Sequence, residues 1–387
     1  MVAGGYDAVT VRILIGDVRQ RLADLPDGSV QCVVTSPPYF GLRDYGTAQW
    51  DGGDPACDHR NGYVHVSKTS TLYSPGEKLP GSAAVKHGEQ IGKSYRDQCR
   101  KCGAVRIDQQ IGLEPTLAEY VQTLVAVFRD VRRVLHPTGT VWCNLGDSFA
   151  DKQLQMVPAR VALALQDDGW WLRSEIVWHK KAPMPESVTD RPTSAHEKIF
   201  LLTKSAKYFY DAIAVAEESL YGPGCGWDDA GHEIAVKTKD VLNPAFRAIK
   251  PTRNQRNVWH MATESFPEAH FATFPSEIPR RCIKAGTSEK GQCPACGAPW
   301  VRVVAPTERY AKYLGKGFTD HADDMGAGRM QNRGVNRQNE MLREGISGKE
   351  VVTTGWQPTC TCNAAVVPQV VLDPFLGSGT TLLVADQ

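Results

Sequence analysis

Short apolar segments alternate with helical segments along this sequence, and this alternation constrains the fold more than any other feature. The segments "VRILI" (11–15) and "VQCVV" (30–34) enclose a helical segment at 18–25, which predicts a βαβ unit. Residues 117–135 carry apolar side chains at helical spacing after a Thr116–Glu119 capping box, and a strand-like segment, "TVWCNL", follows. The alternation predicts an α/β fold with a mostly parallel, twisted sheet and helices on both faces.

The charge balance excludes a strong overall attraction to nucleic acid. Lys and Arg total 44 against 43 Asp and Glu, a net charge of +1, so any site for a polyanion must be local. The N-terminal segment lacks a basic region followed by an apolar one, and no stretch reaches the apolar length of a membrane span. We therefore expect a cytoplasmic protein without membrane contact, whose 11 cysteines are thiols or metal ligands rather than disulfides.

The motif "TSPPY" (residues 35–39) directly follows the apolar segment 30–34. Ligands of open parallel sheets bind at the carboxyl ends of the strands, and two adjacent prolines fix the backbone and remove two of its donors. The motif is therefore suited to presenting a backbone carbonyl to a ligand. A proline-rich loop after an edge strand is the alternative interpretation.

A glycine-rich turn follows the last apolar segment of the sequence. "QVVL" reads as a strand, "DPFLGSG" as a turn and "TTLLVADQ" as the start of a helix. Gly377 and Gly379 allow backbone amides to approach a ligand closely. No lysine follows as in a phosphate-binding P-loop. Taken alone, the turn fits either a cofactor site or a plain tight turn.

Together these two motifs resemble those of the DNA amino-methyltransferases, which methylate cytosine at N4 or adenine at N6 with S-adenosylmethionine. The catalytic motif of that family is (D/N/S)PP(Y/F), its cofactor turn resembles FxGxG, and the order found here resembles the permuted β class. Further similar stretches are "GD" at 16–17, "NLGDSF" from Asn144, "WHKKAPMP" from Trp178, "DRPTSAHE" from Asp190 and "HFATFP" from His270. The resemblance implies a Rossmann-like methyltransferase fold, S-adenosylmethionine as cofactor and double-stranded DNA as partner. A cognate restriction nuclease, in a bacterial or phage setting, is a further candidate partner.

The resemblance also implies roles for individual residues. The catalytic motif corresponds to Ser36, Pro37, Pro38 and Tyr39. The cofactor-binding positions correspond to Asp17, Thr35, Phe274, Pro275, Asp373, Pro374, Phe375, Gly377, Gly379, Thr380 and Thr381. Asp17 is equally well interpreted as a helix N-cap.

The chemistry of an exocyclic amine explains the catalytic motif. The amine is a poor nucleophile because its lone pair is delocalised into the ring, so two acceptors must hold its hydrogens. The Ser36 hydroxyl and the Pro37 carbonyl form such a pair, and Tyr39 would stack on a base flipped out of the duplex. Serine at the first motif position favours cytosine N4 over adenine N6.

The sequence departs from the family at its end. The family usually carries an acidic residue for the ribose hydroxyls on the strand after the glycine-turn helix, whereas this sequence stops at Gln387 within that helix. Two interpretations stay open: a truncated sequence or a lost ribose contact.

Two alternative functions also stay open. One is methylation of RNA or of a protein amide, and the other is that of a catalytically disabled, zinc-containing DNA-binding protein.

Two groups of cysteines have the spacing of metal knuckles. In each "CxxCG" segment the turn aims two thiolates at one cation, and the predicted ligands of two structural zinc ions are Cys57, His59, Cys99 and Cys102, and Cys293, Cys296, Cys360 and Cys362. Thioredoxin-like redox chemistry is the alternative for a CxxC pair, but neither pair opens a helix after a strand. Cys32, Cys143, Cys225 and Cys282 are predicted to be buried, inert thiols.

One local stretch is basic enough to contact DNA. Arg247, Lys250, Arg253 and Arg256 occur with no acidic residue between Asp240 and Glu264, which is suited to phosphates, although a solvated loop is equally consistent. "HEKIF" at His196 lacks the second histidine of a zinc protease, so His196 and Glu197 are expected near the active cleft.

These assignments divide the chain into expected parts. Residues 1–50 with 111–215 form the catalytic half of the methyltransferase domain, and residues 257–290 with 364–387 form the cofactor-binding half. Residues 51–110 and 291–363 are the two zinc-knuckle insertions, and residues 216–256 are the candidate target-recognition region.

Overall fold

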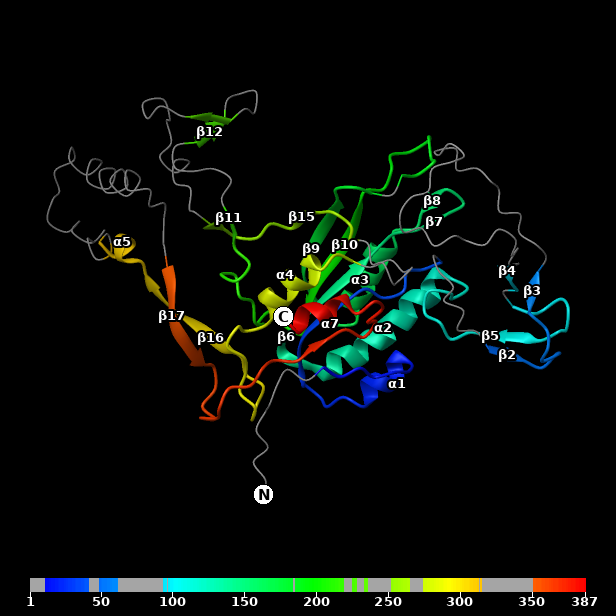
Figure 1. Ribbon diagram of the computed structural model, residues 1–387, viewed down its shortest axis with the longest axis horizontal. Helices are drawn as coiled ribbons and strands as arrows, with labels where there is room; N and C mark the ends of the chain where they lie inside the picture. The colour runs from blue at the N-terminus through cyan, green and yellow to red at the C-terminus, as the bar shows by residue number, and fades with distance from the viewer. Residues whose placement is uncertain are drawn as a thin grey trace, which may run out of the picture. The chain divides into compact units, whose positions relative to one another are not determined.

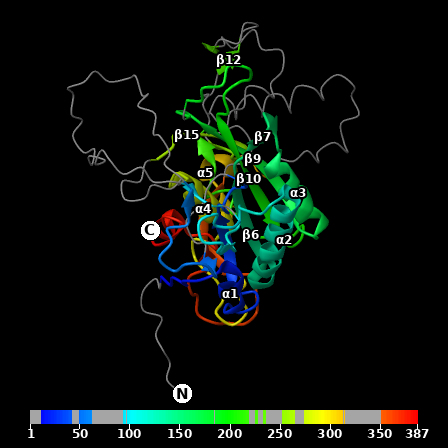
Figure 2. The ribbon, with the colours of Figure 1, turned by 90° about the vertical axis from the view of Figure 1, so that its right-hand side faces the viewer.

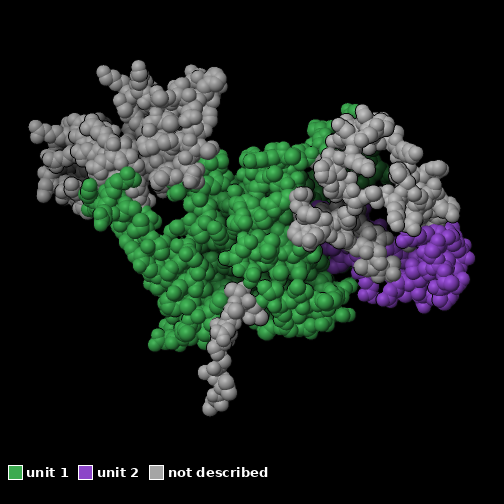
Figure 3. Space-filling model, viewed as in Figure 1, with its two compact units in different colours: residues 1–37, 121–387 green, residues 38–120 purple. Residues whose placement is uncertain are grey.

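The computed structural model describes residues 11–41, 49–61, 93–95, 97–183, 185–218, 225–227, 233–235, 252–264, 274–312, 314 and 351–387. The chain divides into two compact units, one of residues 1–37 with 121–387 and one of residues 38–120, which Figure 3 colours separately. The finer division expected from the sequence stays a prediction.

The first unit is built on a six-stranded sheet with the order β15-β9-β10-β6-β1-β18 (Figure 1). Its strands are β1 (Val30–Thr35), β6 (Leu135–Leu145), β9 (Trp171–Lys180), β10 (His196–Thr203), β15 (Val258–Met261) and β18 (Val371–Leu372). β1 is parallel to both β6 and β18, and β15 is parallel to β9, whereas β10 is antiparallel to both of its neighbours. All strands except β10 therefore run in one direction, as the mostly parallel sheet predicted from the sequence requires.

Helices cover both faces of this sheet. The helices of the described residues are α1 (Val18–Ala23), α2 (Leu117–Val134), α3 (Val157–Asp167), α4 (Glu277–Gly286), α5 (Glu308–Ala311) and α7 (Thr380–Ala385). The short helix α5 contacts β16 (Trp300–Pro306), which lies outside the central sheet. Figure 2 shows α2 and α3 on one side of the sheet and α4 on the other. Ile278, Cys282 and Ala285 of α4 pack into a core cluster with Cys32 of β1 and Trp142 of β6. Full burial of a large apolar side chain contributes roughly 1.5–3 kcal/mol, so this face fixes α4 against β1.

Helix α2 begins as the sequence predicts. The Thr116 backbone amide donates to Glu119 Oε2 at 3.0 Å, and the Glu119 amide donates to Thr116 Oγ1 at 3.2 Å, so both halves of the capping box are formed. Leu124, Phe128 and Val131 follow at helical spacing and are buried. The predicted amphipathic helix is thus confirmed, ending at Val134 rather than at residue 135.

The strand predicted at residues 11–15 is wrong. These residues form no strand, and Ile15 is 90% exposed. A strand needs a free edge to pair with, and both edges of β1 are occupied, one by β6 and the other by β18. The first βαβ unit is therefore replaced by a pairing of β1 with strands that come later in the chain.

Smaller antiparallel strand pairs lie outside the central sheet. They are β2 (Gln49–Asp51) with β5 (Val105–Ile107), β3 (Arg60–Asn61) with β4 (Lys93–Ser94), β7 (Phe149–Ala150) with β8 (Gln153–Leu154), β11 (Glu217–Glu218) with β14 (Thr252–Arg253), β12 (Cys225–Trp227) with β13 (Glu233–Ala235), and β16 (Trp300–Pro306) with β17 (Val351–Pro358). In the part of the chain that the structure describes, no helix combines the length and apolar character needed to cross a membrane.

Candidate active site

The two motifs to which the sequence assigns the chemistry lie at the ends of neighbouring strands. β1 and β18 are parallel, with Cys32 opposite Val371 and Val33 opposite Leu372. The motif "TSPPY" begins with Thr35, the last residue of β1, and "DPFLGSG" directly follows β18. Because parallel strands have their carboxyl ends at the same edge, the two motifs leave the sheet side by side although 338 positions separate Thr35 from Asp373.

A buried carboxylate joins the two motifs. Thr35 Oγ1 donates to Asp373 Oδ1 at 2.6 Å, and the backbone amide of Phe375 donates to the same oxygen at 3.0 Å. Thr381 Oγ1 lies 2.8 Å from Asp373 Oδ2 and 3.3 Å from the carbonyl oxygen of Val34. Asp373 thus contacts β1, the turn and the first residues of α7 at once.

The environment of Asp373 perturbs its ionisation. Burial raises the pKa of this carboxyl group above its usual range, while the hydrogen bonds from Thr35, Thr381 and the Phe375 amide act in the opposite direction. Although the residue as a whole is half-buried, its carboxylate is enclosed by these donors, so desolvation dominates. The carboxylate is therefore held by the fold and serves to position the turn.

The glycines of the turn adopt backbone conformations that other residues avoid. Gly377 has a φ of 54° and Gly379 a φ of 84°, both in the left-handed region. Among the described residues, no atom lies within 4 Å of a Cβ built at Gly379. The glycines are therefore required by the backbone path rather than by crowding, and this path exposes the backbone of the turn.

The first half of the catalytic motif belongs to the sheet unit. Thr35 is buried at the end of β1, and Ser36 and Pro37 follow it. The Pro37 carbonyl is the acceptor that the sequence assigns to the substrate amine.

The second half of the motif is held within the unit of residues 38–120. The Tyr120 hydroxyl donates to the carbonyl oxygen of Pro38 at 2.9 Å, and the Phe40 ring packs on Tyr120 with the ring centroids 5.4 Å apart. A Cβ at Gly112 would lie 2.9 Å from the carbonyl oxygen of Tyr39, so a larger residue would displace this segment. The backbone on both sides of the Tyr39 ring is therefore fixed.

Other expected cofactor residues lie in two places. Asp17 caps α1: its carboxylate accepts from the Arg19 amide at 2.9 Å and pairs with the Arg19 guanidinium at 2.7 Å, and these contacts lower its pKa. Its N-cap role is thus confirmed, whereas its contact with adenine stays a prediction. Phe274 packs against the core cluster, and Pro275 accepts from the Ile278 amide at 3.0 Å where α4 begins. Residues 270–273 of the same motif lie outside the described residues.

A polar network at the same edge of the sheet was missed as a unit from the sequence. Asn144 Nδ2 donates to Glu197 Oε2 at 2.8 Å, and Lys180 Nζ pairs with Glu197 Oε1 at 2.5 Å. These residues lie at the carboxyl ends of β6 and β9 and at the start of the antiparallel strand β10. Each belongs to a motif noted in the sequence, but only the pairing of three strands brings them together.

The candidate DNA-binding arginines share one carboxylate. Arg253 Nε lies 3.1 Å and Arg256 Nε 3.3 Å from Glu217 Oε2. Burial raises the pKa of Glu217, but the two guanidinium groups and the Arg256 amide outweigh this and hold the pKa below its usual range. The three groups keep a net positive charge. Arg247 and Lys250 lie outside the described residues.

The predicted metal ligands come together in two clusters. Cys57, His59, Cys99 and Cys102 form the first, within the unit of residues 38–120, and Cys293, Cys296, Cys360 and Cys362 form the second, within the sheet unit. In each cluster the ligand atoms all lie within 4.8 Å of one another. Cys32, Cys143 and Cys282 are buried apart from both clusters, as predicted, and burial raises the pKa of Cys32 to about 12. The side chain of Cys225 lies outside the described residues.

Comparison with known proteins places this geometry in a family. The family model N6_N4_Mtase, described as DNA methylase, matches residues 30–293. The type II methyltransferase M.Cfr9I of Citrobacter freundii is 33% identical over 352 residues, covering 83% of this chain and 88% of that protein. The type II methyltransferase M.SmaI of Serratia marcescens is 32% identical over 310 residues, covering 73% and 77%.

Solved structures include more distant matches. The PvuII DNA methyltransferase, described as cytosine-N4-specific, is 15% identical with a TM-score of 0.41 and covers 71% of this chain and 70% of its own. The family match spans more than half of the chain, and the M.Cfr9I match spans most of both proteins. The chain therefore belongs to the N6/N4 family of DNA methylases and is a DNA methyltransferase.

Proposed function

We propose that this protein transfers the methyl group of S-adenosylmethionine to the exocyclic amine of a base flipped out of double-stranded DNA, with cytosine N4 preferred over adenine N6. The observation that carries the proposal is the Thr35–Asp373–Thr381 contact. It ties the segment bearing Ser36 and Pro37 to the segment bearing the glycine turn, so an amine and a methyl donor bound to the two segments would be neighbours.

The residues of the turn fit the cofactor by their chemistry. The positive φ angles of Gly377 and Gly379 expose backbone donors and acceptors, and Phe375 provides an apolar ring beside them. These residues, with Phe274 and Pro275 at the start of α4, would hold the cofactor. When bound, S-adenosylmethionine supplies an electrophilic methyl group on a sulfonium centre.

The catalytic residues act on the amine. The Ser36 hydroxyl and the Pro37 carbonyl each accept one amine hydrogen, which favours a pyramidal nitrogen whose lone pair is localised instead of delocalised into the ring. Because the prolines restrict the backbone, the carbonyl is preorganised before the base arrives. Tyr39 stacks on the flipped base, which compensates part of the few kcal/mol that unstacking costs.

The base preference follows from the first motif position. Serine offers a hydroxyl oxygen as the acceptor and leaves more space than aspartate or asparagine. The resemblance to the amino-methyltransferases associates this choice with cytosine N4.

We also propose that methylation is site-specific. Arg253 and Arg256, in the region 216–256, would contribute phosphate contacts, and a nuclease of the same specificity would be a partner.

The test measures the product and the role of Ser36 together. The protein is incubated with isotopically labelled S-adenosylmethionine and mixed-sequence duplex DNA, and the digested nucleosides are separated by chromatography. We expect labelled N4-methylcytosine. Ser36→Ala should lower the rate on the order of 10²–10³-fold, the range for removal of one preorganised hydrogen-bond partner.

The matched variant is Ser36→Asn, which restores an acceptor at the same position and should keep more activity than Ser36→Ala. Labelled N6-methyladenine in place of N4-methylcytosine would show that adenine, and not cytosine, is the target base. DNA that stays unlabelled while RNA or protein is labelled in parallel incubations, or full activity of Ser36→Ala, would refute the proposed function.

A further inference from the structure

We propose that the protein holds two structural zinc ions, one in each cysteine cluster. The first cluster consists of Cys57, His59, Cys99 and Cys102, and the second of Cys293, Cys296, Cys360 and Cys362. Neither cluster takes part in the chemistry proposed above, and the assignment does not depend on that function. Four ligands of this type suit a closed tetrahedral site for zinc.

The distances between ligand atoms match those around a tetrahedral zinc ion. Zinc bonds of about 2.3 Å to sulfur and about 2.0–2.1 Å to nitrogen imply separations of about 3.8 Å between two sulfurs and about 3.6 Å between sulfur and nitrogen. Cys57 Sγ and Cys99 Sγ are 3.7 Å apart, and Cys102 Sγ lies 3.5 Å from His59 Nδ1. A disulfide would require about 2.05 Å between sulfurs. The first cluster therefore has the spacing of four ligands around one ion.

The same knuckle is built twice. The segments 98–104 and 292–298 both read Gln-Cys-x-x-Cys-Gly-Ala. In the first, the Cys99 amide donates to Ala104 O and the Gly103 amide to Cys99 O, both at 2.8 Å. The same sequence pattern in two turns far apart in the chain indicates the same role for both turns, which is to direct two thiolates to one point.

The second knuckle reproduces these contacts. The Cys293 amide donates to Ala298 O at 2.9 Å, and the Gly297 amide donates to Cys293 O at 2.8 Å. The glycine φ angles are 77° at Gly103 and 72° at Gly297, in the region that other residues avoid. The two turns thus share the same backbone hydrogen bonds and glycine conformation, and each directs its two thiolates to one point.

The strands beside the first cluster are too short to be stable alone. β2 and β5 pair over three residues, and β3 and β4 over two. In β2 and β5 the burial alternates between exposed and half-buried positions, so little apolar area supports them. An isolated strand pair is marginal in water, and a bound zinc ion supplies folding free energy directly.

The first cluster also orients its histidine. The Trp50 ring stacks on the His59 ring with centroids 4.3 Å apart and planes 14° apart. Since Trp50 belongs to β2, this stacking fixes the imidazole relative to the strand pair and directs Nδ1 to Cys102. The nitrogen ligand is thereby positioned as firmly as the sulfurs.

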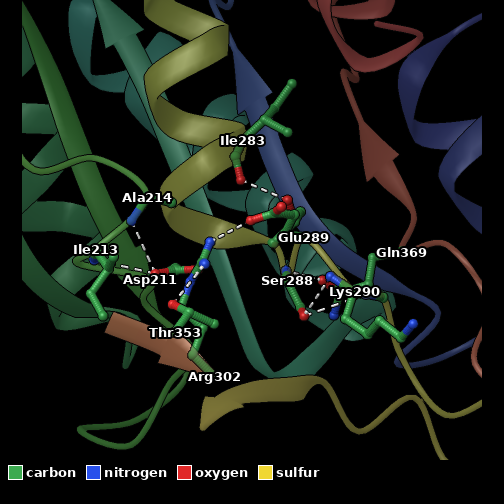
Figure 4. Close-up of polar contacts among 12 residues, drawn as sticks. Asp211, Ile213, Ala214, Ile283, Ser288, Glu289, Lys290, Arg302, Thr353 and Gln369 are labelled. Carbon is green, nitrogen blue, oxygen red and sulfur yellow. Dashed lines mark hydrogen bonds and ion pairs between the residues drawn. The ribbon is translucent and has the colours of Figure 1, made fainter. Parts of the chain in front are cut away.

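The second cluster lies where β16 begins and β17 ends. Its knuckle precedes β16, and Cys360 and Cys362 follow β17, with Trp300 opposite Pro358. The pair is anchored to the sheet unit by Arg302, whose guanidinium lies 2.7 Å from Asp211 and 2.5 Å from Glu289 (Figure 4). The Thr359 hydroxyl donates to the Pro299 carbonyl oxygen at 2.7 Å where the two strands meet, and a zinc ion there would add a second link between them.

The test is the metal content of the full chain, purified without chelators. We expect about two zinc ions per chain. Cys102→Ser and Cys296→Ser should each lower the content to about one, and the double variant to about none. Cys282→Ala, which removes a buried thiol outside both clusters, is the matched control and should keep about two.

Cobalt substitution distinguishes the two sites and gives a readout other than methylation. Cys296→Ser leaves the three-cysteine, one-histidine site, and Cys102→Ser leaves the four-cysteine site, so thiolate-to-cobalt absorption should be weaker in the first variant. If a variant fails to fold, stepwise zinc release from the unmodified chain by a mercurial reagent gives the same count.

Three outcomes would overturn the proposal. These are a chain without metal, a zinc content unchanged in both serine variants, or iron in place of zinc. Metal content and methylation are measured separately, so a failure of the metal assignment is distinguishable from a failure of the proposed function. Loss of methylation in a serine variant, without loss of zinc, does not support the metal assignment.

Discussion

Replacing Thr35 by valine tests the contact that ties the two motifs together. The Thr35 hydroxyl donates to Asp373 at 2.6 Å, and the residue is 1% exposed. Valine keeps the shape of the side chain, so the loss is mainly that of a hydrogen bond to a charged acceptor, worth roughly 1.5–3 kcal/mol. We expect Thr35→Val to lower the free energy of unfolding by about 2 kcal/mol at neutral pH.

The matched control is Thr203→Val. Thr203 is also buried in the sheet, but its hydroxyl donates to the neutral carbonyl of Ser205 at 2.8 Å, so its replacement should cost only about 1 kcal/mol. Urea unfolding of both variants, followed by tryptophan fluorescence, gives the difference. The buried Trp142 and Trp259 report on the sheet core.

The pH dependence separates the two variants further. The pKa of Asp373 is raised in the folded state, so its contribution to stability is complete below its unfolded pKa and is lost as the pH rises through the folded pKa. Thr35→Val removes a contact that lowers this pKa, so the folded pKa rises further and more stability is lost on the alkaline side. The deficit of Thr35→Val should therefore be largest near pH 8 and shrink toward about pH 4. A deficit that is constant with pH, or no larger than that of Thr203→Val, would refute the reasoning.

Three further predictions concern the turn, the DNA contact and the catalytic loop. Gly379→Ala should lower the free energy of unfolding by roughly 1–2 kcal/mol and weaken S-adenosylmethionine binding in calorimetry, because Gly379 has a φ of 84°. Gly355→Ala, at an ordinary φ with open space around it, should do neither. Equal behaviour of the two variants would contradict the assignment of the glycine turn to the cofactor. Arg256→Ala should reduce the slope of log affinity for duplex DNA against log salt by about 1, and an unchanged slope in filter binding would remove Arg256 from the interface. Tyr120→Phe removes the hydroxyl that holds the Pro38 carbonyl and should slow methylation several-fold without unfolding the chain; an unchanged single-turnover rate would show that this contact does not position Tyr39.

Local patterns in the sequence predicted the elements whose partners are close by. The capping box and the apolar spacing of Leu124, Phe128 and Val131 were sufficient for α2, because both depend on contacts within a turn or two of helix. The glycine turn after β18 and the proline motif after β1 were placed at strand ends for the same reason. The prediction for residues 11–15 was wrong because an apolar run does not reveal whether a neighbouring strand has a free edge.

Long-range pairing was the part that the sequence could not supply. Asn144, Lys180 and Glu197 were each noticed within separate motifs, but their network depends on β10 lying between β6 and β9. No local pattern identified β10 as the antiparallel strand of the sheet. Likewise, the sequence assigns Asp373 to the cofactor but gives no sign of its hydrogen bonds with Thr35, Thr381 and the backbone of the turn.

The contacts of Asp373 show how two motifs far apart in the chain are held together. The glycine turn and the catalytic motif need only follow neighbouring parallel strands, and the sheet places β18 beside β1 wherever their sequences occur in the chain. β18 is paired along two residues only, so strand pairing alone would hold the turn weakly. The Thr35–Asp373–Thr381 contacts add a second connection. They run from β1 to the first residues of α7, so any movement of the turn must also strain the segment that bears Ser36.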